Sequence, residues 1–248
     1  MSQLAQTRPR SITEIVDASF RFYRARFGDL IVVSALLLVP PALLTAIAPA
    51  AFQRVIQFAG NWMYLISQGA IAILVAAALE RNQSLSAGEV FRELNGRWGK
   101  VIGASIMSGL MILIGTILLI IPGIIAASWT AVALPVAAIE GLASSDAITR
   151  SRALARGRMG HVLGTMFLIW LIVIVLVIGV AFSLGLVVAM TGVPERLTDM
   201  IGELVMVPLF PLIAITVTLL YYDLRVRSEG ADVAAMIDAL PATPAESA

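Results

Sequence analysis

Residues 101–139 read VIGASIMSGLMILIGTILLIIPGIIAASWTAVALPVAAI, and they give the clearest evidence for the fold class. It contains no charged side chain, and its strongest turn signal is Pro122-Gly123. A membrane-spanning helix needs about 20 mostly apolar residues. Residues 101–121 and 124–139 reach or approach that length on either side of the turn. The stretch therefore predicts two spanning helices joined as a tight hairpin.

Four further apolar stretches of spanning length lie outside this hairpin, at residues 30–49, 62–79, 162–190 and 200–221. Of the 248 residues, 59% are hydrophobic and 13% are charged, whereas an average soluble protein has about 25% charged residues. A soluble fold of this composition would leave large apolar patches in contact with water, but lipid solvates apolar side chains directly. The predicted fold class is an all-α integral membrane protein with six transmembrane helices arranged as three hairpins.

The basic residues are sorted along the chain. Of 17 Lys and Arg residues, all except Arg54 and Arg196 fall in the N-terminal segment or at 81–100, 150–158 and 225–227. Six spans place these four segments on one side, with Arg54 and Arg196 in loops on the other. The positive-inside rule makes the basic side cytoplasmic, so both termini are expected there. Because nearly all the basic residues are Arg, as in GC-rich bacterial genomes, we expect a multi-pass protein of the bacterial cytoplasmic membrane.

A segment with helical, amphipathic spacing precedes each predicted hairpin. Ser11 with Glu14 and Ser86 with Glu89 have the spacing of a capping box at the start of the first two segments. The third segment, residues 144–159, shows a weaker pattern. Helices of this kind lie in the membrane–water interface. Each hairpin is therefore expected to begin with an interfacial helix on the cytoplasmic side.

The same junction follows each amphipathic segment: RFGDLI at 26–31, RWGKVI at 97–102 and RMGHVL at 158–163. An Arg side chain can reach lipid phosphate, an aromatic ring suits the headgroup level, and Gly allows a sharp turn into a spanning helix. The pattern predicts that three junction glycines make these turns: Gly28, Gly99 and Gly160.

The recurrence favours three parallel repeats over independent convergence of the junctions. The predicted repeats cover residues 11–80, 86–140 and 144–228. The transmembrane domain would then span residues 1–228, followed by a cytoplasmic tail at 229–248. In this tail a short helix is expected at 231–240, with disorder beyond it.

The candidate binding residues are arginines at or near the junctions and at the C-terminal exit of the last span. Anionic lipid headgroups are their expected partners, or else an unidentified cytoplasmic protein, since each basic residue near a charged membrane surface contributes about 1 kcal/mol. Nothing in the sequence points to nucleic acid. The candidates are Arg24, Arg26, Arg97, Arg156, Arg158, Arg225 and Arg227.

Catalytic chemistry is not expected from this sequence. The chain has no Cys and one His, and no nucleophile–base pair, phosphate-binding loop or metal-ligand cluster is apparent, so we predict no enzyme activity and no cofactor. His161 is the obvious candidate for catalysis. However, Asp29 and Lys100 occupy the same slot in the other junctions, which favours a polar residue at the membrane boundary.

Prolines interrupt one span of each hairpin: Pro40-Pro41, Pro135, and Pro208 with Pro211. They are read first as kinks, which spanning helices tolerate. Broken helices can also line a binding site, which leaves a transporter or permease as the alternative function. The small-residue pairs Ala104–Ser108, Ser105–Gly109 and Ala127–Ala131 predict close packing of the third span on the fourth.

The C-terminal exit, YYDLRVR at 221–227, combines boundary aromatics with charge. Asp223 and Arg227 have the spacing of an i, i+4 ion pair. The pattern favours an anchor at the membrane boundary over a docking site for a partner.

Three stretches together resemble a known family. They are FRFYRARFG at 20–28; IPG at 121–123 with LPV at 134–136, EG at 140–141 and the segment at 147–157, which includes SRAL at 151–154; and YDLRVRSEG at 222–230. They look like the bacterial membrane domain named after glycerophosphoryl diester phosphodiesterases. The resemblance implies a membrane domain without the catalytic barrel, so no activity is carried over from it. An accessory role in phospholipid-diester metabolism is a further alternative that rests on the family name.

Overall fold

The computed structural model describes residues 8–192 and 194–238, and all the regular secondary structure in those ranges is helical. Six helices are long and apolar enough to cross a membrane. The predicted fold class is therefore confirmed. The helices are α1 (Ile12–Ala25), α2 (Phe27–Ile47), α3 (Ala50–Glu80), α4 (Ala87–Leu94), α5 (Trp98–Leu118), α6 (Ile120–Thr130), α7 (Ala133–Ile139), α8 (Ser144–Ala155), α9 (Met159–Thr191), α10 (Glu195–Met206) and α11 (Phe210–Asp238).

The three helices that precede the hairpins are α1, α4 and α8. The predicted capping boxes begin α1 and α4, with Ser11 and Ser86 each accepting the backbone N–H of the glutamate three residues later. The residue before α8 is Ala143, which has the same extended backbone but no side chain that can cap the helix. The weaker sequence pattern of α8 thus coincides with a missing cap.

Two loops expected outside the membrane are helical instead. Arg54 lies within α3, which begins at Ala50, and Arg196 lies within α10. The prediction of loops at these two residues was wrong because it treated polar residues as the end of a span. In α3, Gln57 and Asn61 are one helical turn apart and line a cavity, so their polarity marks a helix face.

The C-terminal tail also differs from the prediction. α11 continues without a break from the last span to Asp238, so the short helix expected at 231–240 is an extension of that span. The remaining residues of the predicted tail, 239–248, lie outside the described part of the chain.

The hairpin in residues 101–139 turns three residues earlier than predicted. Leu119 has extended backbone, with φ −168° and ψ 151°, between α5 and α6. Pro122 lies in the first turn of α6, where the N–H that it lacks would have no helical acceptor. Its ring therefore suits the start of a helix, and the predicted turn at Pro122-Gly123 was wrong.

The third and fourth spans do pack closely, as predicted, and two glycines outside the predicted pairs lie at a close backbone contact between them. A Cβ placed on Gly115 would lie 3.0 Å from backbone atoms of Gly123, and one on Gly123 would lie 3.0 Å from backbone atoms of Thr116. Gly109, which belongs to a predicted pair, faces open space. A close backbone approach of the two spans therefore lies next to the turn.

Two of the six spans are broken. The fourth span consists of α6 and α7, which are separated at Ala131-Val132, and the sixth consists of α10 and α11, which are separated at residues 207–209. Pro40 and Pro41 lie inside a continuous α2, whereas Pro208 lies in the second break. Proline is thus accommodated within a continuous helix in the first hairpin and lies at a helix break in the third.

The centre of the molecule is formed by α3, α7 and α11, which contact one another and are the last helix of each hairpin. Their side chains in this region are mostly apolar and buried. The buried residues include 70–77 of α3, most of 212–224 of α11, and Ala133, Val136, Ala137 and Ala138 of α7.

The amphipathic helices pack in a cyclic pattern around this centre. α4 packs on α3 of the first hairpin, α8 on α5, α6 and α7 of the second, and α1 on α9 and α11 of the third. Each amphipathic helix therefore covers the hairpin before its own, with α1 closing the cycle.

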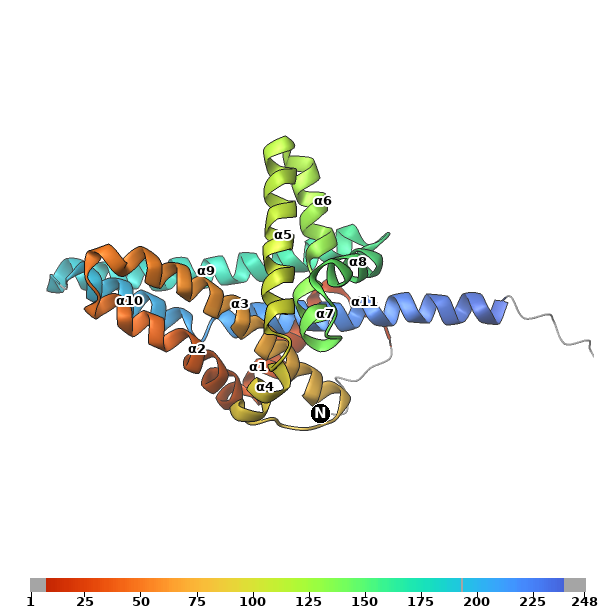
Figure 1. Cartoon of the computed structure of the whole chain (residues 1–248), viewed down its shortest axis with the longest axis horizontal. Helices are drawn as coiled ribbons and strands as arrows, with labels where there is room; N and C mark the ends of the chain where they lie inside the picture. Colours follow the sequence, from red (N-terminus) through yellow and green to blue (C-terminus); the bar gives the residue numbers. More distant parts are fainter. Residues whose placement is uncertain (1–7, 193, 239–248) are drawn as a thin grey trace, which may run out of the picture.

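The α5–α6 hairpin stands apart from the other spans. Figure 1 shows it pointing away from the group formed by α2, α3, α9 and α10. The apolar side chains at its tip, residues 117–121, are 69–75% exposed. Exposure of this kind suits a surface that is solvated by lipid.

Candidate functional site

The junctions bring basic side chains to one end of the spans, where α1, α4 and α8 meet the ends of α3 and α7 and the adjoining part of α11. We refer to this region as the basic end. At the second junction, Arg97 Nη1 donates to the carbonyl oxygens of Ala138 (2.7 Å) and Ile139 (3.2 Å), and Lys100 Nζ donates to that of Gly141 (2.6 Å). Cations at these carbonyls satisfy acceptors left free at the end of α7 and complement its dipole.

The third junction uses the same two positions on its own hairpin. Arg158 Nη2 donates to the carbonyl oxygen of Arg227 at 2.8 Å, and His161 Nε2 lies 2.9 Å from Asp223 Oδ2. As in the second junction, the first helix of the hairpin is tied to the end of the second span by the arginine and by the polar residue three positions later.

The first junction includes a local contact. Arg26 lies 3.5 Å from Asp29. The three junction arginines therefore all have protein partners. Asp29, Lys100 and His161, which occupy the same position in the three junctions, each form a polar contact within the protein. These contacts explain why the position is polar.

The junction glycines do not make the turns. Gly28, Gly99 and Gly160 lie in the first turns of α2, α5 and α9, and a Cβ on any of them would meet no atom within 4 Å. The chain has already entered the spanning helix at these positions, so the predicted turning role of these glycines was wrong.

Two other glycines make the turns at the second and third junctions. Gly96 and Gly157, each directly before the junction arginine, have φ of 79° and 71°. The residues before them, Asn95 and Arg156, have nearly identical backbone angles (φ −58° in both, ψ 133° and 129°). In both places the N–H of the junction arginine donates to the carbonyl oxygen three residues earlier, at 2.9 and 3.0 Å.

These features are those of a type II turn, whose third residue requires positive φ. The same turn at the same distance from two spans is what parallel repeats would produce.

Three consecutive residues of α11 tie the basic end together. The Tyr221 hydroxyl donates to Glu140 Oε1 at 2.9 Å, and the Tyr222 hydroxyl donates to Glu80 Oε1 at 2.8 Å. Asp223 accepts from the backbone N–H of Arg10 at 2.6 Å. Because Glu80 and Glu140 lie at the ends of the second spans of the first two hairpins, α11 reaches both hairpins and the segment before α1.

Asp223 is the most buried charge of this network, with a side chain only 1% exposed. Besides Arg10 and His161, it binds Arg227 Nε at 2.7 Å, which confirms the predicted i, i+4 pair. Arg227 also donates to the carbonyl oxygen of Arg10 at 2.6 Å. A buried carboxylate needs such partners, because an unpaired one would pay a large desolvation penalty.

Sequence reasoning missed this network, although a signal was present. The second spans of the first two hairpins end in AALE (77–80) and AAIE (137–140), and Asp223 supplies an acid near the same end of the third. An acid that recurs at the end of each second span, opposite a polar slot at the start of each first span, would have suggested the pairing.

Hydrogen bonds set the pKa values of several groups outside the spans. The backbone N–H of Ser11 and the side chain of Arg8 lower the pKa of Glu14 to about 2. The Ser86 side chain and N–H likewise lower the pKa of Glu89. The shift of Glu89 comes from the capping box at the start of α4, and that of Glu14 from the capping box at the start of α1 together with Arg8.

A paired contact joins the end of α3 to α4. Arg81 donates two hydrogen bonds to the carboxylate of Glu93, of 2.7 and 2.9 Å. The contact to Glu93 raises the pKa of Arg81. Arg81 is therefore already bound within the protein.

The remaining candidate arginines divide into paired and exposed side chains. Arg225 contacts Glu80 and Glu229. Arg24 and Arg156 are exposed, and neither forms an ion pair with any residue that the structure describes. These two are the candidates whose guanidinium groups are free to meet another molecule at the basic end.

Each broken span is hydrogen-bonded by a hydroxyl group of the amphipathic helix packed on it. The Tyr23 hydroxyl of α1 donates to the carbonyl oxygen of Pro208 at 2.8 Å, and the Ser151 hydroxyl of α8 accepts from the backbone N–H of Val132 at 3.3 Å. Backbone groups freed by a helix break need such partners in a medium without water.

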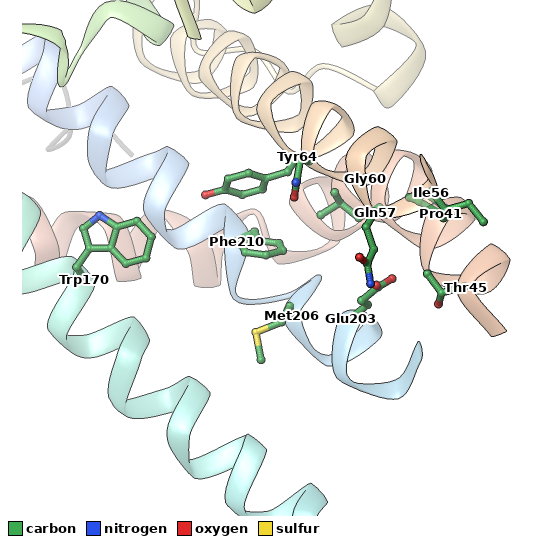
Figure 2. A pocket seen from close by; sticks show the side chains of 12 residues that line it. Pro41, Thr45, Ile56, Gln57, Gly60, Tyr64, Trp170, Glu203, Met206 and Phe210 are labelled. Carbon is green, nitrogen blue, oxygen red and sulfur yellow. The ribbon is translucent and has the colours of Figure 1, made fainter. Parts of the chain in front are cut away.

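A cavity of about 380 Å³ lies away from the basic end, beside the break between α10 and α11. Figure 2 shows the side chains of Gln57 and Glu203 pointing toward each other, with Trp170 reaching the cavity from α9. The Tyr64 and Phe210 rings pack at a centroid distance of 4.4 Å. The lining residues are Leu38, Pro41, Thr45, Ile56, Gln57, Gly60, Asn61, Tyr64, Trp170, Glu203, Met206 and Phe210.

Across the described ranges, no group of three or more His, Asp or Glu side chains could hold a metal ion. Comparison with known proteins gave no matching family model, curated protein or solved structure. The resemblance to the phosphodiesterase membrane domain therefore stays a prediction from sequence.

Proposed function

We propose that this chain is a non-enzymatic multi-pass protein of the bacterial cytoplasmic membrane whose basic end faces the cytoplasm and binds anionic lipid headgroups. The observation that carries the proposal is the pair of exposed arginines, Arg24 and Arg156, at the basic end. Neither guanidinium group forms an ion pair with a carboxylate in the described part of the chain. Phosphate oxygens suit the planar guanidinium group.

The proposed orientation rests on the positive-inside rule. Because the chain contains no Cys, single cysteines can report the side of each segment. Arg92→Cys and Arg152→Cys should react with an impermeant thiol reagent only in opened cells. Arg54→Cys should react in intact cells. Labelling of Arg92→Cys and Arg152→Cys from opposite sides would contradict the proposal.

Lipid binding is tested by native mass spectrometry of protein purified in mild detergent. The double variant Arg24→Gln/Arg156→Gln should retain less phosphatidylglycerol, by about fivefold for each lipid site, since one basic residue contributes about 1 kcal/mol. Arg54→Gln is the matched control, because Arg54 is also exposed but lies on α3 away from the basic end. Equal lipid retention by all three proteins would overturn the proposal.

A permease is a second candidate, and one observation favours it. The cavity lies directly beside the break between α10 and α11, with Met206 and Phe210 from either side of the break in its wall. Broken helices line the substrate sites of many transporters. Uptake of a labelled solute into proteoliposomes that is lost on filling the cavity with Gly60→Leu would support this function.

A further inference from the structure

The cavity beside the break has the chemistry of a binding site for a cation. Its described wall contains one carboxylate, Glu203, and no Lys or Arg. Within the described residues, Glu203 forms no ion pair and no hydrogen bond. Asp199, one helical turn earlier, adds negative charge nearby. A partly buried carboxylate without a partner is stabilised by a bound positive charge.

The surrounding side chains select the kind of cation. Three aromatic residues line the cavity: Tyr64, Trp170 and Phe210. Aromatic faces attract ammonium groups, most strongly Trp and in desolvated sites. A metal ion would find few oxygen ligands here, whereas an organic cation can place an apolar body against Leu38 and Met206. The C-terminal end of α10 also reaches the cavity and carries partial negative charge.

We propose that this cavity binds an amphiphilic ammonium ion, with the positive group between Glu203 and the aromatic side chains and the apolar body against Leu38 and Met206. An anionic ligand would meet no basic residue in the described lining. A purely apolar ligand would leave the carboxylate without a partner. The inference is independent of lipid binding at the basic end, because the two regions share no residue.

Benzyltrimethylammonium binding to the full chain in phosphatidylglycerol nanodiscs tests the proposal by calorimetry, with empty nanodiscs as the background. Glu203→Gln should weaken binding by about tenfold, which corresponds to about 1.4 kcal/mol. Asp199→Asn is the matched control and should weaken binding much less. It removes an equal charge one turn away, at an exposed residue that does not line the cavity.

A second variant keeps the test independent of the carboxylate. Trp170→Leu should also weaken binding, because it removes one aromatic face from the wall. Trp170 is 47% exposed, so its loss should leave the packing of the spans intact. Circular dichroism of each variant checks that the helices are retained.

Four results would each overturn the proposal. They are no saturable binding above empty nanodiscs, equal affinity of the wild type and Glu203→Gln, equal weakening by Glu203→Gln and Asp199→Asn, and equal affinity for the neutral isostere neopentylbenzene.

A further experiment identifies the source of the ammonium group. Competition by phosphatidylethanolamine in the nanodiscs would assign a lipid headgroup, and unchanged affinity in its presence would assign a free organic cation.

Discussion

His161 Nε2 lies 2.9 Å from Oδ2 of Asp223, and the same carboxylate oxygen binds Arg227 Nε at 2.7 Å. One buried acid thus joins α9 to α11 and, through Arg10, to the segment before α1. Asp223→Asn should lower the free energy of unfolding by about 3 kcal/mol or more, because breaking a buried pair leaves a charge uncompensated. Thermal unfolding in detergent measures the effect. Asp17→Asn, at an exposed residue, should change it little, and similar losses for both variants would contradict the assignment.

The turns at the second and third junctions depend on positive φ. Gly96→Ala and Gly157→Ala should each destabilise the protein by about 1 kcal/mol, because a Cβ is disfavoured in the left-handed region. Gly99→Ala and Gly160→Ala should be neutral or stabilising, since Ala is the better helix former and the space is open. Melting temperatures of the four variants separate the two sets. The reverse order would mean that the junction glycines do make the turns.

Close packing beside the Leu119 turn depends on two glycines. Gly115→Ala should destabilise the α5–α6 hairpin by about 1–3 kcal/mol, because the new Cβ would lie 3.0 Å from backbone atoms that cannot move aside like a side chain. Gly109→Ala places the same methyl group in open space and is the control. Protease resistance and unfolding temperature report the difference, and a stable Gly115→Ala variant would argue against this contact.

The third amphipathic helix can be given the cap that it lacks. Ala143 has φ −65° and ψ 160°, close to the −67° and 158° of Ser86. Ala143→Ser should therefore stabilise the protein by about 1 kcal/mol, as N-caps commonly do. Ser86→Ala should cost a similar amount. A drop in melting temperature for Ala143→Ser would show that the backbone there cannot accept the cap.

The first capping box should make stability depend on pH. The pKa of Glu14 is lowered to about 2 in the folded chain, so its contribution is fully present above the unfolded value of about 4.3 and is lost as the pH falls toward 2. Glu14→Gln should be less stable than the wild type at neutral pH, and the gap should narrow below pH of about 4. A gap that stays constant from neutral to acid pH would contradict this origin.

The architecture could be predicted from the sequence because hydrocarbon selects long apolar helices, and that selection is visible in composition alone. The predicted helix boundaries were wrong where a polar residue or a typical turn residue lies inside a helix. Gln57 marked a cavity wall rather than a loop, and Pro122 lay in the first turn of a helix. Gly96 could not be told from Gly99 by residue type, because only the backbone angle distinguishes them.

The candidate sites were harder to predict than the fold. Arg97 and Arg158 were predicted to contact lipid headgroups or a partner protein. Each has a carbonyl partner that is distant in sequence, and only the folded packing brings them together. The pairing of His161 with Asp223 spans 62 residues. The cavity depends on side chains from five helices, and no single segment carries its pattern.

The contacts of Tyr221, Tyr222 and Asp223 with the earlier parts of the chain can form only late in synthesis. The ribosome adds these three residues only after both earlier hairpins have been synthesised. Until then Glu80 and Glu140 lack the phenol groups that they bind in the finished protein. During translation, both carboxylates therefore lack these hydrogen bonds until the final span is made. A nascent chain that stalls before Tyr221 can form neither hydrogen bond.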